Sequence, residues 1–155
     1  MIFLNILFFI NLFFIVKDDY KYREVLLWQL LLLVLFSFSF VNEINIFNRL
    51  ISAFSTVGIM FMLSFLIENY IVYIKSRFTD IDINNTIVIG EGDYPLFFII
   101  GLIFEIQEIL LCIFLMAIFS LIHHLIYIKL KKDEVPLIPS IAYSIIVLSI
   151  FNGIS

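Results

Sequence analysis

The stretch Gly90-Glu91-Gly92-Asp93 leads directly into the apolar run from Pro95 to Phe104. Two glycines allow backbone angles that other residues avoid, and they let a neighbouring chain come close. An acidic side chain at the mouth of a membrane segment costs free energy, and such residues usually mark a working site. The stretch therefore predicts a membrane helix with a candidate functional carboxylate at its start.

The composition of the whole chain supports a membrane environment. Its 155 residues are 63% hydrophobic and 14% charged, with a mean hydropathy of +1.15. An ordinary soluble domain is roughly 45–50% apolar and about 25% charged, so lipid must cover much of this surface. The net charge of −4 argues against a nucleic-acid partner. The single cysteine, Cys112, excludes a disulfide or a thiolate zinc site within one chain.

Apolar runs separated by polar residues predict an all-α fold, a bundle of about six transmembrane segments in one membrane domain, residues 1–155. The N-terminal run has no basic region before it and no small-residue cleavage site, so we expect a retained segment rather than a signal peptide. Small residues, among them Ala53, Gly58 and Gly101, are expected where helices pack closely. The predicted segments are 2–16, 25–41, 50–74, 95–104, 109–130 and 135–151, with a polar cytoplasmic loop at 76–93.

Basic residues give an independent prediction of the topology. With the N-terminus outside and the segments alternating, all of the nine Lys and Arg residues except Arg49 fall on the cytoplasmic side. The same topology brings Asp19 and Asp93 to the cytoplasmic face. Merging the fourth and fifth segments would move residues 129–132 outside and spoil this bias, so the two are predicted to be separate.

A second acidic cluster, Asp18 and Asp19, lies at the end of the first segment. It could be a solvated turn or one half of an aspartic dyad. Two carboxylates a few ångströms apart share a proton, so one can act as a base on water while the other polarises a carbonyl group. Adjacent helical residues point in different directions, so only one of the two can readily face Asp93. Asp93 has its own alternative, a helix N-cap worth about 1 kcal/mol.

Three stretches carry a resemblance to a known family. Gly90-Glu91-Gly92-Asp93 matches the glycine-x-glycine-aspartate motif of the type IV prepilin peptidase and preflagellin peptidase family. Asp19, followed by Lys21, Arg23 and a new apolar segment, resembles the first aspartate region of that family. Residues 135–142, with their two prolines, are similar to the start of its last segment.

The resemblance implies a membrane-embedded aspartic endopeptidase that needs no metal and no cofactor. It would cleave leader peptides from prepilin-like precursors at the cytoplasmic face of a prokaryotic inner membrane. Asp19 and Asp93 would be catalytic, Asp18 is the reserve candidate, and Gly90, Glu91 and Gly92 would support the motif.

The chain also departs from the family pattern. It has Val25-Leu26-Leu27 where the family usually has isoleucine, proline and a polar residue, and Pro95 where lysine is frequent. These departures motivate an alternative, a non-catalytic or degenerate membrane component such as an assembly factor or a small transporter subunit.

Overall fold

The computed structural model describes residues 2–22, 24–41, 45–78, 91–129 and 137–152. Every regular element in these ranges is a helix, so the all-α fold predicted from the sequence is confirmed. Residues 79–90, most of the predicted polar loop, lie outside the described ranges. The helices are α1 (Ile2–Tyr22), α2 (Leu27–Ser37), α3 (Ile46–Phe78), α4 (Tyr94–Ile103), α5 (Ile106–Lys129) and α6 (Ile138–Phe151), with 3-10 turns η1 (Phe38–Phe40) and η3 (Glu91–Asp93).

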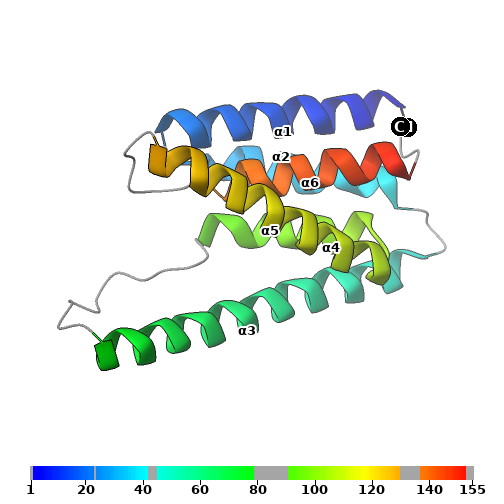
Figure 1. Cartoon of the computed structure of the whole chain (residues 1–155). Helices are drawn as coiled ribbons and strands as arrows, with labels where there is room; N and C mark the ends of the chain where they lie inside the picture. Colours follow the sequence, from blue (N-terminus) through cyan, green and yellow to red (C-terminus); the bar gives the residue numbers. More distant parts are fainter. Residues whose placement is uncertain (1, 23, 42–44, 79–90, 130–136, 153–155) are drawn as a thin grey trace.

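The bundle is built around the short helix α4. Figure 1 shows α1 on one side and α3 on the other, with α2, α4, α5 and α6 between them. Helix α4 contacts α2, α3, α5 and α6, whereas α1 packs along α2 and α6. The apolar run that follows Pro95 therefore becomes the centre of the fold.

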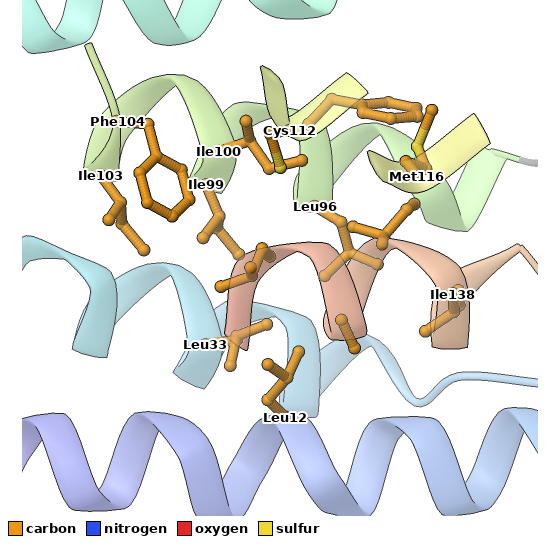
Figure 2. Packing of buried hydrophobic residues seen from close by; sticks show 14 of the residues in the cluster. Leu12, Leu33, Leu96, Ile99, Ile100, Ile103, Phe104, Cys112, Met116 and Ile138 are labelled. Atoms are coloured by element: carbon orange, nitrogen blue, oxygen red, sulfur yellow. The ribbon is translucent and has the colours of Figure 1, made fainter. Parts of the chain in front are cut away.

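The core forms where α4 meets its neighbours. Seven of the ten residues of α4 are buried, because the run contains no polar side chain that would require solvent. Figure 2 shows Leu96, Ile99 and Ile100 of α4 in one cluster with Cys112 and Met116 of α5. Leu12 of α1, Leu33 of α2 and Ile138 of α6 complete this cluster. In lipid such contacts stabilise chiefly through close packing, since the tails are as apolar as the side chains.

Helices α3 and α4 approach each other at Gly101. A Cβ at Gly101 would lie 2.6 Å from Cα of Ala53, 2.6 Å from Oγ1 of Thr56 and 2.7 Å from the carbonyl oxygen of Ser52. Small residues permit this approach of two backbones. The predicted close contact is confirmed at Gly101, but Gly58 has open space where a Cβ would lie.

Among the described residues, two helices have the length and composition of membrane spans. They are Ile46–Tyr70 within α3 and Ile106–Tyr127 within α5, with mean hydropathies of 2.2 and 2.6. Only 22% and 17% of these windows are buried, whereas a core helix of a soluble protein is mostly buried. Large apolar side chains such as Phe61 and Phe114 are exposed on them. Both helices therefore fit a membrane protein.

A group of polar contacts lies at the end of the bundle where α4 and α6 end. The backbone N–H of Glu105 donates to Oε2 of Glu108 at 2.8 Å, as in a capping box at the start of α5. Asn152, after α6, donates to Oε1 of Glu108 at 2.7 Å. Arg49 of α3 lies 3.5 Å from Oε1 of Glu105. These exposed acids have an architectural role, remote from the site described below.

Candidate active site

The structure brings Asp19 and Asp93 to one end of the bundle. Asp19 lies in the last turn of α1, and Asp93 is the last residue of η3, immediately before α4. Figure 1 shows that α1, α3 and α5 finish at this end, and that α4 and α6 begin there. Two acids more than seventy positions apart in the sequence thus come to the same end of the fold, opposite to the end that carries Glu105 and Glu108.

Both side chains are buried. Asp19 is 8% exposed and Asp93 is 7% exposed, and they are the only buried ones among the acidic residues whose side chains the structure describes. Aspartate is almost never buried without partners, because removing a carboxylate from water is expensive. Both take part in interactions within the fold. Such carboxylates are retained at a free-energy cost, which points to a functional site.

Asp93 precedes α4 without capping it. Its backbone is helical, with φ −82° and ψ −26°, and its side chain makes no capping hydrogen bond. An N-cap residue typically has an extended backbone and accepts a hydrogen bond from the first turn. Pro95 is in the first turn of α4, where the missing N–H is harmless. Capping therefore does not account for the burial of Asp93.

The rest of the glycine motif is only partly described. Gly90 lies outside the described residues, and Glu91 begins the turn η3. Gly92 is exposed, and a Cβ added there would meet nothing within 4 Å. Its φ lies outside the left-handed region. Nothing in the described structure thus requires glycine at position 92.

Asp18 has a different environment from Asp19. Gln29 of α2 donates from Nε2 to Oδ2 of Asp18 at 2.7 Å. Asn11 of α1 in turn donates to the backbone oxygen of Gln29 at 2.8 Å. Asp18 and Asn11 therefore join α1 to α2. This structural role separates Asp18 from Asp19, a distinction that the sequence alone left open.

A second polar chain at this end was missed by the sequence analysis. Oη of Tyr20 lies 2.9 Å from Nε2 of His123, and Nδ1 of His123 lies 2.8 Å from Oγ of Ser140. Ser144 donates to the backbone oxygen of Ser140 at 2.8 Å. The available signal was a serine pair at i and i+4 on α6, one helical face, together with a histidine inside an apolar helix. Neither feature identifies its partner from the sequence.

A helical bundle that fits a membrane and buries two carboxylates at one end is typical of a membrane protein with an ionisable site. A family model described as the type IV leader peptidase family matches residues 6–125. The match covers most of the 155 residues, and the chain belongs to this family. The matched range includes Asp19, Asp93 and His123 and ends within α5. No curated protein and no solved structure matches the chain.

Membership of this family confirms the resemblance inferred from the sequence. The family is membrane-embedded and consists of leader peptidases, which agrees with the apolar helices α3 and α5. A leader-peptidase-like function follows for this chain in general terms.

Proposed function

We propose that this protein is an aspartic endopeptidase that removes leader peptides from prepilin-like precursors, with Asp19 and Asp93 as its catalytic pair. The observation that carries the proposal is the burial of these two acids, the only buried ones among the acidic side chains that the structure describes, at the same end of the bundle. Family membership supports the reaction class, since leader peptidases hydrolyse a peptide bond. The motif residues Gly90, Glu91 and Gly92 belong to the same proposal.

The positions of the two acids on their helices suggest different roles. Asp93 stands at the N-terminus of α4, where the helix dipole favours a negative charge. Asp19 lies in the last turn of α1, where the dipole disfavours one. In a pair that shares one proton, Asp93 is therefore the ionised base and Asp19 holds the proton.

The reaction then follows from these two states. Asp93 removes a proton from a water molecule, and the water oxygen attacks the scissile carbonyl carbon while Asp19 donates a hydrogen bond to the carbonyl oxygen. Collapse of the tetrahedral intermediate breaks the C–N bond, and the departing amine takes up the proton that Asp93 removed from water, which restores the ionised Asp93. The products are a free leader carboxylate and a new N-terminal amine.

Helix ends also support the proposed orientation, with the N-terminus outside and the site in the cytoplasm of a prokaryotic cell. Lys17 and Lys21 lie near the end of α1, and α3 and α5 finish with basic residues at the same end of the bundle. Arg49 lies at the opposite end, beside Glu105. An excess of basic residues marks the cytoplasmic side of membrane proteins. We place residues 1–155 in a single membrane domain.

The alternative, a non-catalytic or degenerate component, assigns Asp93 the role of a helix cap. The side chain of Asp93 makes no capping hydrogen bond to α4, so this alternative does not explain why Asp93 is buried.

The test is cleavage of a precursor whose leader precedes a membrane helix, in membranes that contain wild-type protein or a single variant. Asp19→Asn and Asp93→Asn should each abolish cleavage while the protein remains inserted, because an amide cannot replace an ionisable carboxylate. Asp18→Asn is the matched control. Its amide oxygen can still accept the hydrogen bond from Gln29, so cleavage should persist. Cleavage by Asp19→Asn or Asp93→Asn, or none by the wild type, would contradict the proposal.

A further inference from the structure

We propose that Tyr20 and His123 are positioning residues that hold Asp19 in its catalytic orientation. The inference deepens the proposed function and rests on it, because it takes Asp19 as one of the catalytic acids. Its basis is the hydrogen-bonded chain from Tyr20 through His123 to Ser140, which joins α1, α5 and α6.

Asp19 lies between two residues that are tied to different helices. Asp18, before it, accepts a hydrogen bond from Gln29 of α2. Tyr20, after it, is hydrogen-bonded to His123 of α5. Successive residues of an α-helix are rotated by about 100°, so these two anchors project to either side of Asp19. The side chain of Asp19 is therefore fixed in rotation about the axis of α1, which neither anchor could achieve alone.

The hydrogen bond between Tyr20 and His123 joins α1 to α5, two helices that do not pack along each other. Helix α1 packs along α2 and α6, so the hydrogen bond between Tyr20 and His123 adds a connection to α5. His123 is 9% exposed, and its ring stands at 81° to that of Tyr20 and 36° to that of Tyr143. Packing of these rings restricts the imidazole to one orientation, which makes His123 a rigid support.

Both ring nitrogens of His123 are hydrogen-bonded, so donors and acceptors alternate in one direction along the chain from Tyr20 to Ser140. A neutral imidazole has one donor and one acceptor nitrogen, so one of the two hydroxyls donates to it and the other accepts from it. Ser140 is fully buried and is fixed further by the bond from Ser144 to its backbone oxygen. In a setting of low polarity, a satisfied chain of this kind is rigid. The last turn of α1 is thereby attached to the start of α6.

Kinetics of three variants distinguish a positioning role from a structural one. Tyr20→Phe removes only the hydroxyl and should lower kcat about five- to tenfold with KM unchanged, as expected for one hydrogen bond. At position 123, glutamine places its amide near the position of Nε2 and asparagine near that of Nδ1. His123→Gln, which can still reach Tyr20, should therefore retain more activity than His123→Asn. Tyr22→Phe, which removes an exposed hydroxyl from the same turn of α1 and leaves the Tyr20 bond intact, is the matched control and should keep the wild-type kcat.

A second measurement does not depend on activity. Cys112 is buried and is the only native cysteine, so Asp19→Cys adds one new thiol. We expect Tyr20→Phe and His123→Asn each to accelerate alkylation of the residue-19 thiol by N-ethylmaleimide at least about fivefold. Alkylation of Cys112 on α5 should remain slow, because the fold as a whole is intact. Mass spectrometry of the two peptides separates the sites.

The outcomes separate the two proposals. An unchanged kcat in Tyr20→Phe, or an unchanged alkylation rate at position 19, would overturn the positioning role even where Asp19→Asn abolishes cleavage. Wild-type membranes that cleave no precursor would contradict the proposed function instead, and the alkylation measurement would still decide whether Tyr20 and His123 fix position 19. Faster alkylation of both thiols would show general loosening of the fold and would also overturn the inference.

Discussion

Gly101 of α4 packs directly on Ala53 of α3, and a Cβ at position 101 would lie 2.6 Å from Cα of Ala53. Atoms of two backbones cannot separate without moving the helices, so even a methyl group must push α3 away from α4. Gly101 therefore sets the spacing between α3 and α4, the central helix that begins directly after Asp93.

Gly101→Ala should destabilise the protein by about 1–3 kcal/mol, the usual cost of overpacking a core. Gly58→Ala is its matched control, since nothing lies within 4 Å of the added Cβ and alanine favours a helix by about 0.5–1 kcal/mol over glycine. Thermal unfolding in one detergent measures both variants. Equal stability of Gly101→Ala and the wild type would contradict the close contact.

Gly92 gives a prediction in which stability and activity diverge. It is exposed and has open space around the Cβ position, so Gly92→Ala should leave the stability within about 0.5 kcal/mol of the wild type. We expect cleavage to fall, because the open space in front of η3 is where a substrate backbone would approach Asp93. Comparison of unfolding temperature and initial cleavage rate checks this. Full activity with normal stability would show that the glycine serves neither the fold nor the substrate.

The Asp18–Gln29 hydrogen bond should contribute to stability and, as one of the two anchors of Asp19, to kcat. Asp18→Ala leaves Nε2 of Gln29 buried without this acceptor, which costs about 1–3 kcal/mol. Asp18→Asn retains an acceptor oxygen and should be much less affected. Unfolding temperatures rank the two variants. The kcat of the folded protein should fall in Asp18→Ala, which lacks this anchor of Asp19, and stay close to the wild-type value in Asp18→Asn. A complete loss of cleavage in Asp18→Asn would instead make Asp18 a catalytic residue.

The sequence was sufficient for the features that depend on local composition. Long apolar runs predicted a helical bundle, and the tetrapeptide ending at Asp93 with the acid at position 19 indicated the family. Contacts between residues that are far apart in the sequence could not be predicted in the same way. Nothing in the apolar helix α5 shows that His123 meets Tyr20, because the partner is 103 positions away. The choice between Asp18 and Asp19 likewise needed the position of Gln29 on α2.

The cap alternative for Asp93 shows why local signals can mislead. An acid just before a helix that opens with proline has the sequence pattern of an N-cap. The structure places a 3-10 turn directly before α4, so Asp93 has a helical backbone, and its side chain makes no capping hydrogen bond. The backbone geometry of these three residues thus determines whether Asp93 caps α4, and the amino-acid composition does not specify that geometry.

The proposed dyad predicts that activity depends on pH at both limits. Cleavage requires Asp93 ionised and Asp19 protonated, so kcat/KM should fall in acid as Asp93 gains a proton and fall in alkali as Asp19 loses one. The two limbs belong to the coupled pair rather than to single residues. Initial rates measured in the same membranes across the pH range test this, with stability of the protein checked at each pH. A rate that stays constant into alkaline solution would mean that no protonated carboxyl is needed, and Asp19 would then have to act in another way.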